Sequence, residues 1–141
     1  MILSKIFKYT SRQIDYVQAF PHAPLAQGEE IYMEIPRGYE YSGQSGTEYV
    51  MKLKKNLYGI KQAAANWNKM LTNGLKSPGF KQSDHDPCLF IKQHIMCVIY
   101  VDDTIFFSKD DKIIDTNINS LKTWVLTSLT REMLTPSLEL K

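Results

Sequence analysis

The chain has 141 residues, of which 43% are hydrophobic and 23% charged, and its formal net charge is +2. That length suits one domain with one core, and the composition excludes an intrinsically disordered chain. A net charge this small does not by itself indicate a nucleic-acid partner. The longest apolar run, from Ile95 to Val101, is far shorter than the roughly 20 residues of a membrane helix. With no signal peptide expected either, we predict a cytoplasmic protein with no membrane partner.

Three short strands are expected in the first part of the chain. Residues 14–20 form a largely apolar run that ends at Pro21, where regular structure should stop. Residues 31–36 and 49–53 each alternate between apolar and polar side chains, which is typical of strands with one buried face. Residues 37–48 between them are rich in Gly and Ser and predict a loop.

A helix should follow, because apolar side chains recur at three- and four-residue spacing from Ile60 onwards. The members of this stripe are Ile60, Ala63, Ala64, Trp67, Met70, Leu71 and Leu75. The helix should end near Ser77-Pro78-Gly79, which is a stop signal. We expect Trp67 to be a core residue.

Between residues 88 and 121 the sequence predicts further short strands and a second helix. Residues 88–91 and 95–101 predict a hairpin, and residues 104–108 predict a further strand. The apolar stripe formed by Ile114, Ile118 and Leu121 predicts the start of a second helix. Strands and helices in this mixed order favour an α+β fold, in which helices pack on one face of an antiparallel sheet.

Asp102 and Asp103 stand between two strongly strand-forming apolar segments. A hairpin that buries both segments would hold the two carboxylates close together at its tip, partly removed from water. Like charges in that position repel one another unless a cation lies between them. Oxygen ligands alone select hard cations, chiefly Mg²⁺.

Asp15 repeats this pattern, with Ile14 before it and the run Tyr-Val-Gln-Ala-Phe after it. If the two strands are neighbours, Asp15 and Asp102 could bridge two Mg²⁺ ions about 3.5–4 Å apart, as in phosphoryl transfer. The alternative is that Asp102-Asp103 is a plain hairpin turn and Asp15 a strand-end cap. Composition alone favours this alternative, because Asp is common in turns.

Two other groups invite a metal assignment that we do not favour. Asp84-His85-Asp86 precedes Pro87, so an Asx-type turn is the better interpretation. Cys88 and Cys97 lie in apolar stretches without metal-ligand spacing, so we expect reduced, buried thiols.

Tyr100-Val101-Asp102-Asp103 resembles the YxDD box of reverse transcriptases. Four further runs, in family order and spacing, are similar to the copia-type LTR retrotransposon polymerase. They are RQIDYVQAFPHAPL, EEIYMEIPRGYE, MKLKKNLYGIKQAAANW and GFKQSDHDPCLFIK, and the box itself lies in VIYVDDTIFFS. Together these runs cover about residues 12–122, and five ordered blocks are far more specific than the box alone.

The resemblance implies roles for the aspartates and for one aromatic residue. The expected metal ions are two Mg²⁺, with Mn²⁺ as a possible substitute. Asp15 would bind both of them with Asp102 as its partner, and Asp103 would have a lesser role. Phe20 falls where the family places an aromatic ring against the sugar C2′, which would exclude a ribonucleotide 2′-OH. The alternative for Phe20 is a plain core residue.

The resemblance also implies a nucleotide-binding block, Tyr58, Gly59 and Gln62, in front of the first long helix. Glycine there would permit close approach of the backbone. Where the family usually has proline and then a basic residue, this chain has Ala64 and Ala65. That departure removes a helix-start signal and a charge that could contact the nucleic-acid backbone.

Basic residues are densest just before this block. Lys52, Lys54, Lys55 and Lys61, together with Tyr100 of the box, could contact the phosphates and bases of a primer–template. A solvated strand face is an equally good interpretation of the lysines.

The expected function is therefore that of a reverse transcriptase palm spanning residues 1–122, with fingers and thumb missing. Its implied partners are an RNA or DNA primer–template, a deoxynucleoside triphosphate, and the integrase and RNase H of a Pol polyprotein. In an intact element it would reside in a cytoplasmic virus-like particle. We expect the isolated chain to be a weak or inactive polymerase.

The likeness stops after Lys122. Residues 124–141 can be back-translated, with suitably chosen codons, into a DNA sequence that encodes the family's continuation when it is read in another frame. We therefore expect residues 123–141 to be a frameshifted tail that frays or packs poorly.

One alternative function is a non-catalytic retrotransposon relic that at most binds nucleic acid. Another is a different two-metal enzyme, such as a nucleotide cyclase or phosphohydrolase, whose Gly-rich phosphate loop or further His and Asp ligands the sequence lacks.

Overall fold

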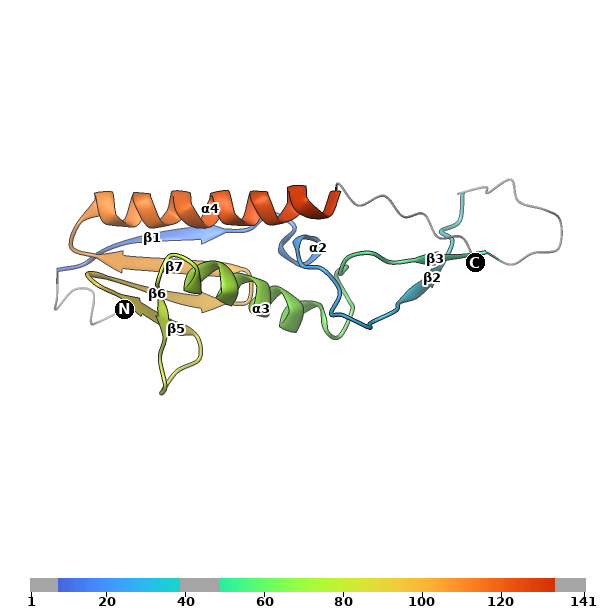
Figure 1. Ribbon diagram of the computed structural model, residues 1–141, viewed down its shortest axis with the longest axis horizontal. Helices are drawn as coiled ribbons and strands as arrows, with labels where there is room; N and C mark the ends of the chain where they lie inside the picture. The colour runs from blue at the N-terminus through green and yellow to red at the C-terminus, as the bar shows by residue number, and fades with distance from the viewer. Residues whose placement is uncertain (1–7, 39–48, 134–141) are drawn as a thin grey trace.

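A computed structural model describes residues 8–38 and 49–133, with side chains described as far as Thr127 (Figure 1). Five strands form one antiparallel sheet in the order β1-β7-β6-β5-β4. Their bounds are β1 (Thr10–Asp15), β4 (Lys81–Gln82), β5 (Leu89–Lys92), β6 (Ile95–Tyr100) and β7 (Asp103–Ser108). Strands β5, β6 and β7 follow one another in sequence and in space, which confirms the expected hairpins.

In the part of the chain that the structure describes, three helices accompany the sheet: α2 (Ala19–His22), α3 (Ala63–Lys76) and α4 (Asp111–Met133). The two long helices, α3 and α4, contact each other, and α4 also contacts β7. Figure 1 shows them running alongside the strands. A separate two-stranded pair, β2 (Tyr32–Glu34) with β3 (Val50–Lys52), projects from the end of the molecule where α2 lies.

The core lies between the sheet and the two long helices. Burial alternates along β6 and β7, because one face of the sheet is covered and the other is not. The largest fully buried side chains come from both layers: Trp67, Phe90, Phe106, Leu71, Leu75, Ile99, Ile114 and Leu121. This arrangement confirms the α+β class expected from the sequence.

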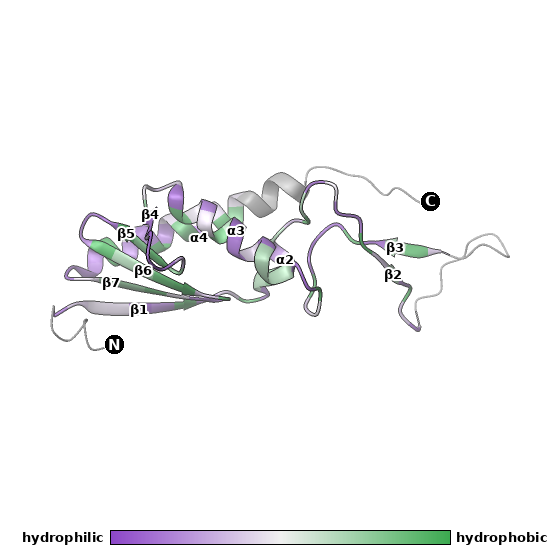
Figure 2. Cartoon of the chain, turned by 90° about the horizontal axis from the view of Figure 1, so that it is seen from below, coloured by the Kyte–Doolittle hydropathy of each residue, from purple (hydrophilic) through white to green (hydrophobic). Residues whose placement is uncertain are grey.

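Figure 2 shows the same division by hydropathy: β6 is hydrophobic along most of its length, whereas β1 is largely hydrophilic. Strand β1 carries the sequence TSRQID and is exposed at all but one of its positions. Within the described residues, no helix combines the length and the apolar character that crossing a membrane requires.

Helix α3 buries most of the apolar stripe that predicted it. The helix ends at Lys76 with Ser77 as its C-cap residue, and Gly79 has a φ of +98°, a left-handed conformation that favours glycine after a helix. Two positions differ from the expectation: Ile60 precedes the helix, and Ala64 is exposed. A side chain as small as Ala loses little by facing water, so spacing alone assigned it wrongly.

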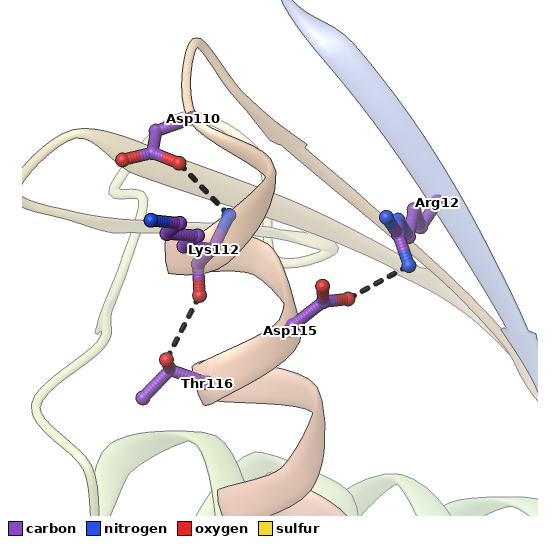
Figure 3. A network of polar contacts seen from close by, with 5 residues as sticks. All are labelled: Arg12, Asp110, Lys112, Asp115 and Thr116. Atoms are coloured by element: carbon purple, nitrogen blue, oxygen red, sulfur yellow. Dashed lines mark hydrogen bonds and ion pairs between the residues drawn. The ribbon is translucent and has the colours of Figure 1, made fainter.

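The start of α4 is held by short-range polar contacts and one ion pair (Figure 3). The Asp110 carboxylate accepts a hydrogen bond of 2.8 Å from the backbone N–H of Lys112, as a helix N-cap does. Arg12 of β1 forms an ion pair of 2.8 Å with Asp115, which joins the edge strand to the helix. Both side chains are about half exposed, so this pair adds little stability.

The strand expected at residues 14–20 is wrong from Tyr16 onwards, and the observed strand begins earlier, at Thr10. Strand β1 ends at Asp15, and Gln18 adopts the left-handed conformation with a φ of 56°. The chain then enters the short helix α2, in which Ala19 is fully buried. An apolar run of this length suits a buried turn and helix as well as a strand, and the packing decided between them.

The tail expected to begin at residue 123 does not fray at once. Helix α4 continues to Met133, with Val125 buried and Trp124 half-buried against α3. Residues 134–141 lie outside the described residues, and the frameshift remains a prediction.

Candidate functional site

The β6–β7 turn carries the two adjacent aspartates. Tyr100 at the end of β6 pairs with Asp103 at the start of β7, and Val101 and Asp102 form the turn between them. Val101 has a φ of 54°, an unusual left-handed conformation for a β-branched residue. Asp102 and Asp103 are both half-buried, while Tyr100 is 73% exposed.

Asp15 lies beside this turn, although it is far away in the sequence. Strands β1 and β7 pair in antiparallel register, and Asp15 stands directly opposite Asp103. Residues opposite each other in such a pair have Cα atoms about 4.5–5.5 Å apart and side chains on the same face. That face is the one turned away from the helices, since the neighbouring Thr104 on the other face is buried.

Gln13 also belongs to this group. It lies two residues before Asp15, on the same face, and its Nε2 donates a hydrogen bond of 2.9 Å to Oδ1 of Asp103. The bond fixes one oxygen of that carboxylate and leaves the other free for a second partner. Nothing in the sequence singled out Gln13, because only the strand register brings it to Asp103.

A layer of aromatic rings supports the turn from the core side. Trp67 of α3 is fully buried, and its indole Nε1 donates a hydrogen bond of 2.8 Å to the carbonyl oxygen of Val101. The ring of Tyr16, the residue after Asp15, meets the Trp67 ring edge to face at 5.1 Å. Burial raises the pKa of Tyr16 to about 12, so its hydroxyl stays neutral. The expected core role of Trp67 is confirmed, and its hydrogen bond to the turn is an additional role.

The donor chemistry at this strand end suits a hard divalent cation, since it consists of carboxylates on neighbouring strands with partial access to water. Asp15, Asp102 and Asp103 are the residues that could hold such an ion. Within residues 8–38 and 49–133, no group of three or more His, Cys, Asp or Glu side chains is arranged as a formed metal site. The structure thus brings the three aspartates to the same end of the sheet, but their carboxylates do not surround a common metal position.

A second candidate feature is a pair of aromatic rings in contact, one on α2 and the other in the loop before α3. The ring centroids of Phe20 and Tyr58 are 4.8 Å apart, with an angle of 38° between the planes. Tyr58 is 56% exposed, and Gly59 has a φ of +92°, which lets the chain turn there without strain. Gln62 is half-buried at the residue before α3. The structure therefore brings together two of the residues expected to contact a nucleotide.

The lysines expected to bind nucleic acid occupy different surroundings. Lys52 of β3 is ion-paired with Glu30, and its Nζ lies 5.8 Å from the centroid of the Tyr32 ring. Lys54 and Lys61 are exposed, whereas Lys55 is half-buried where the chain bridges to Pro24. The lysines are therefore not equivalent, and Lys54 and Lys61 are the more accessible cations of the four.

Of the remaining candidate groups, Asp86 and Cys97 behave as expected, whereas Cys88 is less buried than expected. Oδ1 of Asp86 accepts a hydrogen bond of 2.8 Å from the backbone N–H of Cys88, which is an Asx-type turn. Both cysteines are free; Cys97 is buried and Cys88 is half-buried. Burial raises the pKa of the Cys97 thiol to about 12.

Comparison with known proteins identifies the family. The family model described as reverse transcriptase (RNA-dependent DNA polymerase) matches residues 2–130. The chain belongs to the reverse transcriptase family. No solved structure gives a significant match to this reverse transcriptase chain.

Several curated relatives of this reverse transcriptase chain are transposon polyproteins. The Pol polyprotein of transposon TNT 1-94 from Nicotiana tabacum is 38% identical over 72% of the chain, and that of transposon RE1 from Arabidopsis thaliana is 33% identical over 78%. A truncated Ty1-A Gag-Pol polyprotein from Saccharomyces cerevisiae is 34% identical over 72% of the chain. The matched region spans only about 8% of the length of each of these three relatives.

Proposed function

We propose that this chain is the palm of an RNA-directed DNA polymerase, which extends a primer 3′-OH with deoxynucleotides at Asp15, Asp102 and Asp103. The observation that carries the proposal is the strand register that sets Asp15 opposite Asp103, at the turn that also holds Asp102. These residues lie almost 90 positions apart in the chain, so neither a local turn nor a local cap accounts for their meeting.

Asp15 and Asp102 would hold two Mg²⁺ ions, with Mn²⁺ as a possible substitute. When bound, such a pair of ions stabilises the attacking and the leaving oxygen in phosphoryl transfer. The chain's own contribution is to hold the carboxylates in place. Gln13 fixes one oxygen of Asp103, and Trp67 fixes the carbonyl oxygen of the turn.

The sugar of the incoming nucleotide would lie against Phe20. A ring at that point leaves no space for a 2′-OH, which selects deoxynucleotides, and Tyr58 packs against it from the neighbouring loop. Tyr58, Gly59 and Gln62 would contact the nucleotide. The glycine has no side chain to obstruct the approach of a base or phosphate.

A primer–template would lie along the basic residues. Lys54 and Lys61 are exposed and would contact phosphates, with Lys52 and Lys55 assisting and Tyr100 stacking on a base. The relatives named above are Pol or Gag-Pol polyproteins, so a natural setting for this palm is a longer chain that also carries an integrase and an RNase H. In such an element the chain would reside in a cytoplasmic particle.

The test is primer extension on an RNA template with Mg²⁺, comparing the parent with Asp15→Asn and Asp102→Asn. Loss of either carboxylate should lower the extension rate by about 100-fold or more, as expected when a charge that acts in the transition state is removed. A Mg²⁺ titration by calorimetry on the same proteins gives a readout that does not depend on turnover.

Asp84→Asn is the matched control, because it makes the same change in charge at an exposed aspartate in the loop before Pro87. Its extension rate should stay within about twofold of the parent, as is usual for surface substitutions. Equal rates in the parent and Asp102→Asn would refute the proposed site. No extension by the parent, with nucleic acid still bound, would instead identify a non-catalytic relic.

A further inference from the structure

Asn56 is fully buried although its side chain is a polar amide, and both polar atoms of that side chain form hydrogen bonds. Its Nδ2 donates to the carbonyl oxygens of Ala23 at 2.9 Å and Pro24 at 2.8 Å. Its Oδ1 accepts from Nδ2 of Asn66 at 3.3 Å. A buried amide is costly unless its bonds are made, so this residue holds its neighbours firmly.

The first pair of bonds reaches the end of α2. Ala23 is the residue that caps α2, and its backbone N–H donates to the carbonyl oxygen of Phe20 at 3.0 Å. The Asn56 amide therefore fixes the helix turn that carries the Phe20 ring. The backbone N–H of Asn56 also donates to Ala23, at 3.3 Å, which adds a second link between the two segments.

The third bond reaches the start of α3. Nδ2 of Asn66, on the first turn of α3, contacts both Asn56 and Oε2 of Glu29, each at 3.3 Å. The same Glu29 oxygen accepts from the backbone N–H of Ala26 at 3.0 Å. Residues 57–62 run from Asn56 to α3, so the two ends of the loop that carries Tyr58 are joined through one amide.

The geometry points to Asn56 as a positioning residue that sets the contact between the Phe20 and Tyr58 rings, and through it the preference for deoxynucleotides over ribonucleotides. The inference rests on the proposed function, since it assumes that Phe20 faces the nucleotide sugar. Asn56 is too deeply buried to touch a nucleotide itself. Without the side-chain amide, the Pro24 carbonyl oxygen loses the donor from Asn56, and the Ala23 carbonyl oxygen keeps only the longer bond from the Asn56 backbone N–H, so α2 and the loop are held together less firmly.

The experiment measures the dissociation constants of dGTP and GTP in the presence of Mg²⁺, for the parent, Asn56→Ala and a control. The control is Asn68→Ala, which removes the same side chain from an exposed position on α3. In the parent dGTP should bind more tightly than GTP. In Asn56→Ala the ratio of the two constants should fall by about tenfold, the effect of about one lost buried hydrogen bond, and in Asn68→Ala it should not change.

A second measurement follows the ring contact without any nucleotide. Nuclear Overhauser signals between the Phe20 and Tyr58 rings should be strong in the parent and in Asn68→Ala, and weak in Asn56→Ala. Asn66→Ala removes only the link to α3, so it serves as the milder variant should Asn56→Ala fail to fold. Compared with Asn56→Ala, Asn66→Ala should weaken the ring contact less and should reduce the ratio of the GTP and dGTP dissociation constants by a smaller factor.

Each contrary outcome is distinct. An unchanged ring contact and an unchanged ratio in the variants would overturn the role of Asn56 and leave the proposed function intact. An equal loss of affinity for both nucleotides, with the ratio kept, would show a general structural role and overturn the inference as well. A folded parent that binds neither nucleotide would refute the proposed function, and the role in selection with it.

Discussion

Trp67 joins the core to the candidate site through one hydrogen bond. The side chain is fully buried, and its Nε1 donates at 2.8 Å to the carbonyl oxygen of Val101, whose φ of 54° is costly for a β-branched residue. A turn in that conformation persists only where its surroundings hold it. Helical spacing could predict that Trp67 is buried, but it carries no information about where the indole N–H points.

Trp67→Phe should lower the free energy of unfolding by about 2–4 kcal/mol, because it removes ring volume and leaves the Val101 carbonyl without a donor. Denaturant titration followed by circular dichroism measures the change. Trp124→Phe is the matched control at the half-buried second tryptophan, and it should cost less than half as much. Equal losses in the two variants would contradict a special role for the bond to the turn.

The two long helices pack closely because Gly74 on α3 has no side chain. A Cβ at Gly74 would lie 2.7 Å from Cε3 of Trp124 and 3.1 Å from Cδ1 of Leu121, both on α4. The first distance is shorter than real contacts allow, so the helices or the ring would have to shift. The sequence shows a glycine inside a helical stripe, yet only the crossing of the two helices explains it.

Gly74→Ala should lower the free energy of unfolding by about 1–3 kcal/mol, since overpacking outweighs the roughly 1 kcal/mol that Ala gains over Gly as a helix former. The same substitution in a Trp124→Ala background should be neutral or stabilising, because the clashing ring is gone. Thermal unfolding of the four proteins forms a double-mutant cycle. A stabilising Gly74→Ala in the parent would show that the helices do not approach as described.

Over the whole molecule, two titratable groups are buried between the layers. Burial raises the pKa of both Tyr16 and Cys97 to about 12, from values of 10.0 and 9.0. Between pH 9 and 12 the unfolded chain releases protons that the folded chain keeps, so the free energy of unfolding must fall as the pH rises through this range. At about pH 7 and below, well under both unfolded-state pKa values, both groups keep their protons in either state and exert no such effect.

Tyr16→Phe should flatten this fall between pH 10 and 12, where Tyr16 alone accounts for up to about 3 kcal/mol. Urea titrations at several pH values measure it. Cys97→Ala should flatten the profile from pH 9 upwards, which distinguishes the two groups. Parallel profiles for the parent and Tyr16→Phe would show that the tyrosine hydroxyl is not buried as described.

Local patterns in the sequence predicted much of the fold correctly. Strands β5, β6 and β7 follow one another by short turns, so alternation and turn residues were sufficient to find them, and apolar spacing found α3 and the start of α4. The boundary between β1 and α2 was predicted wrongly, because an apolar run of that length fits either structure. The candidate carboxylates were identified from residue type and family resemblance, and their proximity was only an assumption.

The sequence by itself determined the α+β class, the order of the hairpins, and the residue types that point to a cation at the acidic turn. The tertiary structure alone decided which distant segments meet: the register of Asp15 against Asp103, the Gln13 contact, and the buried Asn56 bridge. The physical reason is the distance along the chain over which a sequence pattern carries information. Periodicity records which face of an element is buried, whereas pairing across almost 90 residues depends on how the whole core packs.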